Sequence, residues 1–310
     1  VALLGFYFWA NNQFMVQRVL GAKNLNHGRW GALFAGLLKL PVLFIMVVPG
    51  VLALLLFNDL DISNLNYPLA TGGMCENLTD CPNLTYPVLL FQLLPAGILG
   101  LVVAGLLAAM MSSVSATFNS ASTLITMDFV RQLKPELTSK QLVRAGQIAT
   151  LVLVVLASAW VPFIERVSDS LWGYLQLVIA FTSPPVVSAF VLGLFWKRAN
   201  SSGAFVSLIC GGIFAVFMIL SASFDLWPYL NEFHFLAKAN LLFLISVVIH
   251  VVVSLSTAPP EVEKVAEYTY KKELFTSETE ELRALPWYQN YRYLAVILLL
   301  LTTIVVVWFW

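Results

Sequence analysis

Oxygen-bearing side chains gather in one stretch of the sequence, AAMMSSVSATFNSASTLITMD, which runs from Ala108 to Asp128 and carries eight hydroxyls and one amide. On a helix, five of these residues share one stripe because they recur at three- and four-residue steps: Ser112, Ser115, Asn119, Ser122 and Thr126. A hard cation such as sodium binds hydroxyl and carbonyl oxygens, so the pair Ser112–Ser113 is a candidate cation site. The alternative is close helix packing through small residues, which accounts for most of the stripe, and we expect the stripe to face the protein interior.

Lys39 is an ionisable residue inside an apolar run, LFAGLLKLPVLFIMVVPG. It lies ten residues beyond Arg29, which places it about 15 Å into a hydrocarbon core about 30 Å thick if the run is a helix. Burying such a group costs several kcal/mol, so a binding role is the first interpretation. A structural ion pair, or a lysine that reaches the interface past a kink at Pro41, is the alternative.

Gln176 is the only amide side chain in its apolar run, and it precedes Ser183-Pro184-Pro185. The two prolines predict an interruption of the helix there, and broken helices at membrane depth mark binding cavities. A hydrogen bond between helices is the alternative role for Gln176.

The beginning of the chain, in YFWANNQFMVQR, combines an aromatic side chain with several amides. Trp9 precedes Asn11, Asn12 and Gln13, and Gln17 follows. An aromatic face and several amides match the apolar and hydroxyl faces of a sugar, so this segment suits a polyhydroxylated ligand better than lipid.

The elements that must position these residues are membrane-spanning helices. Hydrophobic residues make up 59% of the 310 residues and charged residues 11%, and the mean hydropathy is +0.83. These values predict an all-α membrane protein, and the net charge of zero gives no reason to expect a nucleic-acid partner. A helix crosses the bilayer with about 20 apolar residues. Eight runs qualify, the third of which is expected to continue as helix to about residue 130: 1–17, 31–57, 87–112, 143–162, 170–195, 203–222, 236–256 and 292–310.

The basic residues fix an orientation for these spans. Of the 17 Lys and Arg residues, all but Lys39, Arg166 and Lys238 fall in loops on one side, which the positive-inside rule makes cytoplasmic. We therefore expect a multi-pass protein of the cell membrane with Trp310 outside. The chain opens without Met or a signal-peptide pattern, so we expect that it begins inside a larger protein whose N-terminal half precedes it.

Three regions follow from this topology: a transmembrane core over 1–257, a charged cytoplasmic linker over 258–290 and a final span over 291–310. An outside loop, 58–86, contains Cys75 and Cys81, for which a disulfide and a coincidence of two thiols are equally acceptable interpretations. The loop also holds two NLT sequons, at Asn77 and Asn83, where glycosylation depends on the source organism.

Catalytic signatures are missing from the sequence. It contains no Gly-rich phosphate loop, no cluster of Cys and His with metal-ligand spacing and no Ser/His/Asp set. We therefore expect neither an enzyme nor a resident cofactor.

Several of these stretches together resemble the sodium/solute symporter family, and most of all its sodium/glucose cotransporter branch. The matching stretches lie in family order between about residues 5 and 257: NQFMVQRVLGAKNLNH, LLKLPVLFIMVVPG, MSSVSATFNSASTLITMD, YLQ with SPP, and GLFWKRANSSGAF. The resemblance implies the LeuT-type inverted-repeat fold, in which two five-helix halves alternate access around a midplane site. The first five spans would then be the second repeat, followed by additional C-terminal helices.

The resemblance also implies roles for individual residues. The Ala109 carbonyl and the hydroxyls of Ser112 and Ser113 would form one wall of a sodium site, with sodium as a co-transported ion. Lys39 and Gln176 would match sugar-binding positions, and Trp9 would match the aromatic residue beside the inner gate. With Phe8 at a gate position and Gln13 of the amide-rich segment, these are the five residues expected at the solute site. Three positions depart from the sugar-transporter pattern, with Phe8 in place of a gate Tyr, Gly5 in place of a hydrogen-bonding side chain and Gly173 in place of an Asp. Ala116 replaces a Ser of members with a second sodium site, which favours one sodium per cycle.

The implied activity is sodium-coupled import of a small polar solute, with a sugar or polyol first. Because of the three departures, an inositol, a carboxylate or an amino acid is an alternative solute. A transporter-like membrane sensor that signals through 258–290 is an alternative of another class, although that linker contains no recognisable output domain.

Overall fold

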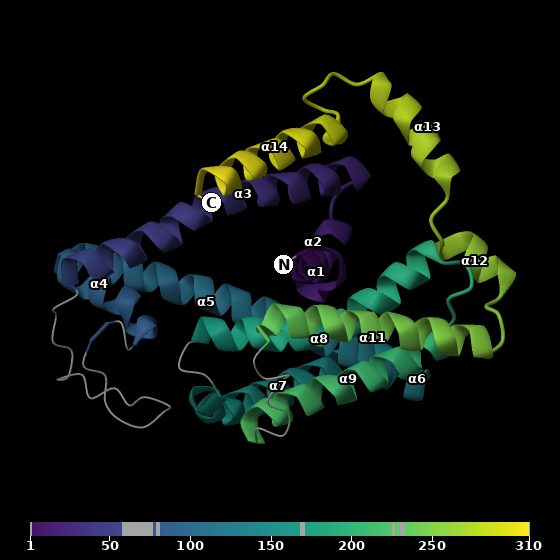
Figure 1. The fold of residues 1–310 in the computed structure, drawn as a ribbon, viewed down its shortest axis with the longest axis horizontal. Helices are drawn as coiled ribbons and strands as arrows, with labels where there is room; N and C mark the ends of the chain where they lie inside the picture. The colour runs from purple at the N-terminus through teal and green to yellow at the C-terminus, as the bar shows by residue number, and fades with distance from the viewer. Residues whose placement is uncertain are drawn as a thin grey trace. The chain divides into compact units, whose positions relative to one another are not determined.

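The computed structural model describes residues 2–57, 77–78, 81–167, 171–224, 227, 229 and 233–309. Every regular element in this part of the chain is a helix (Figure 1). The chain forms two compact units, one made of Val1–Leu33 with Leu175–Trp310 and the other of Phe34–Tyr174. They are described separately below.

Seven helices in the described ranges are long and apolar enough to cross a membrane. They are Leu25–Leu56, Ala96–Leu133, Ser139–Pro162, Leu171–Phe195, Ser201–Met218, Phe235–Ser256 and Tyr291–Trp308. These correspond to seven of the eight predicted spans, which confirms the all-helical membrane class.

The remaining predicted span, the first in the chain over 1–17, is not one continuous helix, so that prediction is wrong. The segment consists of α1 (Ala2–Phe6), a π-helical turn η1 (Tyr7–Asn11) and α2 (Gln13–Leu20). Asn12 has extended backbone angles and separates the last two. Its side chain accepts a hydrogen bond from the Phe14 N–H at 3.1 Å, so it caps α2 and satisfies a donor that the break would leave unpaired.

The third span begins later than predicted and continues as far as predicted. Helix α5 starts at Ala96, because Leu94 and Pro95 have extended backbone angles and separate it from the short helix α4 (Thr85–Leu93). At its other end α5 runs to Leu124 and continues through η4 (Ile125–Val130) and α6 (Arg131–Leu133). Helix α7 (Ser139–Val167) follows and packs against α5 and η4.

The broken helix expected at Ser183-Pro184-Pro185 is also wrong: the prolines interrupt the hydrogen bonding, but α8 (Leu171–Phe195) is helical throughout. Two carbonyls lose their helical donors at the prolines. The residues are nevertheless buried, and a Cβ on Gly211 of the neighbouring helix would lie 2.5 Å from the Pro185 ring. Tight packing across this glycine therefore holds the helical path.

Helices α9 (Ser201–Phe224) and α11 (Phe235–Ser256) lie side by side (Figure 1). Their contact follows a four-residue repeat on each helix, a pattern of small residues that lets backbones approach closely. The facing sets are Gly203, Ser207 and Gly211 on α9, and Ser246, His250 and Ser254 on α11. The Ser207 Oγ donates to the Ser246 carbonyl at 2.8 Å, so the contact has a hydrogen bond at its centre.

Asn200 fixes the segment that follows α11. Its Oδ1 accepts from the Gly203 N–H at 2.8 Å and so caps α9. Its Nδ2 donates to the Thr257 Oγ1 at 2.7 Å and to the Ala258 carbonyl at 2.8 Å. Arg198 adds a bond from Nη2 to the Thr257 carbonyl at 2.7 Å. These bonds tie the end of α11 to the start of α9.

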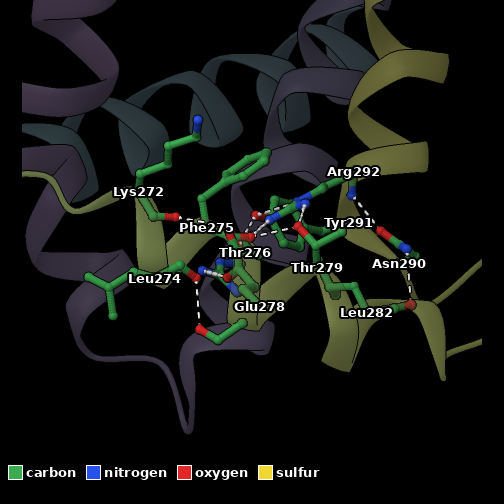
Figure 2. A network of polar contacts seen from close by, with 12 residues as sticks. Lys272, Leu274, Phe275, Thr276, Glu278, Thr279, Leu282, Asn290, Tyr291 and Arg292 are labelled. Carbon is green, nitrogen blue, oxygen red and sulfur yellow. Dashed lines mark hydrogen bonds and ion pairs between the residues drawn. The ribbon is translucent and has the colours of Figure 1, made fainter.

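The predicted linker contains helices α12 (Val262–Tyr268) and α13 (Lys272–Arg283), and α14 (Tyr291–Phe309) follows. Glu278 of α13 is the centre of a polar network (Figure 2). It pairs with Arg29 near the start of α3 (Leu25–Phe57) and with Arg292 of α14 at 2.7 Å, and it accepts from the Tyr291 hydroxyl at 2.8 Å. One carboxylate therefore joins the first turns of two spanning helices.

Arg292 holds α13 at several further points. Its Nη1 donates to the Thr279 Oγ1 at 2.6 Å, and its guanidinium lies 4.0 Å from the centre of the Phe275 ring. Burial acts to raise the pKa of Glu278, but hydrogen bonds from Arg292 and Tyr291, together with Arg29, outweigh it and lower that pKa.

The predicted outside loop lies mostly beyond the described residues, and Cys75 is among those not described. Cys81 is disulfide-bonded and buried. Asn77 and Asn83 are exposed, and the Asn83 Oδ1 accepts from the Leu171 N–H at 3.2 Å. The third cysteine, Cys210, is a free, half-buried thiol on α9.

Replacing Gly211 by Ala should destabilise the protein by about 1–3 kcal/mol, because the new methyl group would collide with Pro185 and overpack the contact. Gly212→Ala is the matched control: nothing lies within 4 Å of a Cβ at that position, so the change should be neutral or slightly stabilising. Thermal unfolding of both variants in detergent measures the difference. Equal melting temperatures would contradict the close approach.

Replacing Glu278 by Gln should loosen α13, which amide hydrogen exchange would detect as faster exchange over Lys272–Arg283 at neutral pH. Because folding lowers the pKa of Glu278, the charged carboxylate stabilises the folded state. This stabilisation is complete at pH values above the ordinary pKa of 4.5. The difference between the two proteins should therefore disappear as the pH falls through the folded-state pKa. Glu280→Gln, on an exposed face of the same helix, should leave exchange unchanged at either pH.

Candidate functional site

The predicted site residues divide between the two units. Phe8, Trp9, Gln13 and Gln176 belong to the first unit. Lys39, Ala109, Ser112 and Ser113 belong to the second.

The aromatic and amide segment surrounds the break in the first span. Phe8 and Trp9 lie on the π-helical turn with their rings edge to face, 5.6 Å between centroids. Gln13 is the first residue of α2, directly after the break. The Asn11 Oδ1 is buried and has no hydrogen-bond partner among the described residues. An unpaired buried oxygen beside a helix break is a free acceptor for a hydroxyl ligand, since such groups normally find a partner.

Gln176 is a half-buried amide near the start of α8. Its side chain forms no hydrogen bond with the described residues. Helix α8 contacts the broken segment through Phe190 and Phe6, whose rings lie edge to face 6.1 Å apart. An amide side chain has two donors and one acceptor oxygen, and those of Gln176 are not used within the part of the chain that the structure describes.

Ala109, Ser112 and Ser113 lie on one face of a regular part of α5, because positions three and four apart on a helix are neighbours. Both serines are exposed. The Ser113 carbonyl accepts from the Thr117 Oγ1 at 2.9 Å, whereas neither serine hydroxyl donates to a described residue. The turn therefore presents a set of adjacent oxygens that a hard cation could use.

The later part of the hydroxyl stripe has a different environment. Ser122 and Thr126 are buried, and a Cβ on Gly146 of α7 would lie 3.4 Å from the Thr126 Oγ1. The expectation of an interior-facing stripe is thus confirmed for this half, while the half from Ser112 to Asn119 is exposed within the chain.

The buried half of the stripe, with Ser122 and Thr126, lines a cavity of about 370 Å³ between α5, η4 and α7. The sequence analysis did not anticipate this cavity. Gln147 and Thr150 complete its polar lining, and the Thr126 Oγ1 has no partner among the described residues. The signal that could have found it is the polar spacing of Gly146, Gln147 and Thr150 on α7, at the turn that faces the stripe.

Lys39 lies on α3, which is helical through both Pro41 and Pro49. Its side chain is exposed on the surface of its unit. Pro41 lies inside this helix, two residues after Lys39.

The chain is similar to characterised transporters along most of its length. Residues 2–211 match the model of the sodium:solute symporter family. The sodium/myo-inositol cotransporters of Homo sapiens and Bos taurus are 38% identical over 285 residues and 37% identical over 286 residues, covering 88% of this chain in each case. The sodium/glucose cotransporter 4 of Danio rerio is 35% identical over 298 residues, covering 93% of it.

The alignments cover 39%, 40% and 45% of these three relatives, so the chain spans about two fifths of their length. The family match extends over the broken first span, the helix with Lys39, the hydroxyl stripe and the helix with Gln176. The chain belongs to the sodium:solute symporter family.

Proposed function

We propose that the whole protein imports a small cyclic polyol, a sugar or an inositol, together with sodium. The observation that carries the proposal is the family match over residues 2–211, which includes the serine pair on α5 and the broken first span. The relatives named above are cotransporters of sodium with myo-inositol or glucose. Both solutes are rings of hydroxyl groups, which amide side chains and an aromatic face can bind.

The sodium site in this proposal lies at Ala109, Ser112 and Ser113. The carbonyl and the two hydroxyls replace part of the hydration shell of the ion, and they require no charged ligand. Sodium is a substrate of the cycle, and the protein carries no resident cofactor.

The solute site lies at the break in the first span and on α8. Trp9 and Phe8 offer an aromatic face, and Gln13 and Gln176 offer amides. Lys39 adds a cationic donor from the helix that follows. Asn11, with its unpaired buried oxygen, joins this set as an acceptor.

The transport cycle in this proposal uses a LeuT-type inverted repeat, with this chain contributing the second repeat and the helices after it. A discontinuous helix is the feature that builds midplane sites in such transporters, and the break at Asn12 supplies one. Sodium binding favours the outward-open state and raises solute affinity, and the solute raises sodium affinity equally. The protein lies in the cell membrane, with Trp310 on the outer side.

Radiolabelled uptake by the whole protein, with and without sodium, tests the proposal. The panel contains glucose, myo-inositol, a monocarboxylate and an amino acid. Uptake of one of the two cyclic polyols should require sodium and should be concentrative. Uptake restricted to the carboxylate or the amino acid would overturn the solute assignment, and uptake independent of sodium would overturn the coupling.

Replacing Ser113 by Ala in the whole protein should raise the half-saturating sodium concentration by about fivefold or more, since one of few oxygen ligands is lost. Solute affinity at saturating sodium should change little. The control is Ser115→Ala, on the same helix but outside the three proposed ligands. A sodium response that is unchanged in Ser113→Ala, or equally changed in Ser115→Ala, argues against the site.

Replacing Gln176 or Lys39 by Ala should raise the solute KM by about fivefold or more at saturating sodium, because each change removes hydrogen bonds to solute hydroxyls. The half-saturating sodium concentration, measured at saturating solute, should stay close to that of the unmodified protein. Thr182→Val is the control on α8, since the Thr182 hydroxyl already donates to the Val178 carbonyl at 2.8 Å. Normal solute KM values in both alanine variants would show that the pocket lies elsewhere.

A further inference from the structure

Two cavities in the described part of the chain are lined by a buried polar side chain that has no hydrogen-bond partner there. One, of about 490 Å³, lies at one end of α8, α9 and α11, and its lining includes the ionisable side chains of His250 and Glu261. The other is the cavity of about 370 Å³ beside Thr126, between α5, η4 and α7. This second cavity lies within one unit, and its lining contains none of the residues proposed to bind sodium or the transported solute.

Thr126 is the observation that points to a ligand in the second cavity. The residue is 6% exposed, and its hydroxyl has no partner among the described residues. Other threonines of the same helical segment donate to the carbonyl four residues earlier, Thr117 at 2.9 Å and Thr123 at 2.7 Å. Gly146 of α7, which faces the Thr126 Oγ1, has no side chain to cover it. Since buried hydroxyls are nearly always paired, this one indicates a partner that occupies the cavity.

The backbone also departs from the α-helix at Thr126. Element η4 is a π-helical turn, in which the Arg131 N–H donates to the Thr126 carbonyl five residues earlier. Turns of this kind are rare and occur frequently at functional sites. The departure from α-helical geometry therefore coincides with the unpaired hydroxyl.

The other polar groups of the lining offer both donors and acceptors. The hydroxyls of Ser122 and Thr123 donate to the Asn119 carbonyl at 3.1 and 2.7 Å, and their oxygens can still accept. The Thr150 hydroxyl likewise donates to a carbonyl of its own helix at 3.0 Å. The side-chain amides of Asn119 and Gln147 form no hydrogen bond with the described residues, and each carries two donors and an acceptor oxygen. A hydroxyl group, which both donates and accepts, complements this set.

The charge and size of the cavity restrict the ligand further. Among the described residues, the lining contains no Asp, Glu, Lys, Arg or His. The cavity lies between two spanning helices, where a charged ligand without a counter-charge would be costly. Met127, Leu142 and Val143 add apolar surface to the lining. A volume of about 370 Å³ falls within the range of small-molecule sites, about 300–1,000 Å³, and exceeds what a single ion requires.

We propose that this cavity is a second binding site, for a small uncharged cyclic polyol. Asn119, Gln147 and the open hydroxyl of Thr126 bind the hydroxyl groups of the ligand, and the apolar residues pack against its ring. The site lies near the end of the span that precedes Arg131 and Lys134, whose position predicts the cytoplasmic side. The cavity itself is independent of the transport site, and only the choice of glucose and myo-inositol as probes rests on the proposed function.

Solute binding to the purified whole protein, with all sodium replaced by potassium, tests the proposal. In the proposed cycle the transport site needs sodium for high solute affinity, so binding that persists without sodium reports the second site. Equilibrium dialysis measures radiolabelled myo-inositol and glucose separately, and at least one of them should bind. Gln147→Leu should weaken this binding by about fivefold or more, because hydrogen bonds to the ligand are lost. Gln147 is exposed, so the change leaves the packing of α7 intact.

Thr126→Val gives a second test, because valine keeps the shape of threonine and removes the unpaired hydroxyl. Without solute the melting temperature should be unchanged or higher, since a buried group without a partner is removed. The increase in melting temperature on adding the bound polyol should be smaller than in the unmodified protein. Thr117→Val, on α5 but outside the cavity lining, is the matched control and should leave sodium-free solute binding unchanged.

The remaining outcomes overturn the polyol assignment. Neither solute binds without sodium, or the binding is the same in Gln147→Leu and Thr126→Val as in the unmodified protein: the cavity is then no polyol site. If sodium, and neither polyol, raises the melting temperature in a Gln147-dependent way, the ligand is a cation. Should Thr126→Val fail to yield folded protein, Gln147→Leu decides alone. Loss of sodium-dependent uptake would refute the transport proposal, while Gln147-dependent binding without sodium would still support the second site.

Discussion

The close approach of α8, α9 and α11 depends on two glycines of α9, Gly203 and Gly211, which have no side chain. Lipid chains are as apolar as the helices, so helices associate in a membrane largely through van der Waals contact and hydrogen bonds. Gly203 and Gly211 permit this contact, because a single methyl group at either position would meet His250 or Pro185. The helical path through two prolines, the buried position of His250 and the cavity beside it all depend on this constraint.

The polar groups of the proposed transport site follow from a different constraint, which is that a helix break in a membrane needs its own hydrogen-bond partners. Asn12 supplies the cap for α2, so the break costs little where it occurs. It leaves the Asn11 oxygen unpaired and places aromatic rings and an amide on either side. The segment that departs from regular helix is thus also the segment that a polyol could bind.

Glu278 shows how a charged linker can be part of a membrane fold. Its carboxylate pairs with Arg29 and Arg292, which lie in the first turns of α3 and α14. Trp30 adds a hydrogen bond from its Nε1 to the Gln289 carbonyl at 3.0 Å. The linker helix α13 therefore fixes the two helix starts relative to each other.

The sequence by itself determined the membrane class, seven of the eight spans and the adjacency of Ala109, Ser112 and Ser113, because these depend on hydropathy and helical period alone. Tertiary structure decided where helices break. The sequence suggested a break at Pro184–Pro185 and continuity through Asn12, and both were wrong, since packing against Gly211 and a side-chain cap decide the local path. The two cavities, at Thr126 and at His250, were also beyond the sequence, because each depends on how side chains of different helices pack against one another.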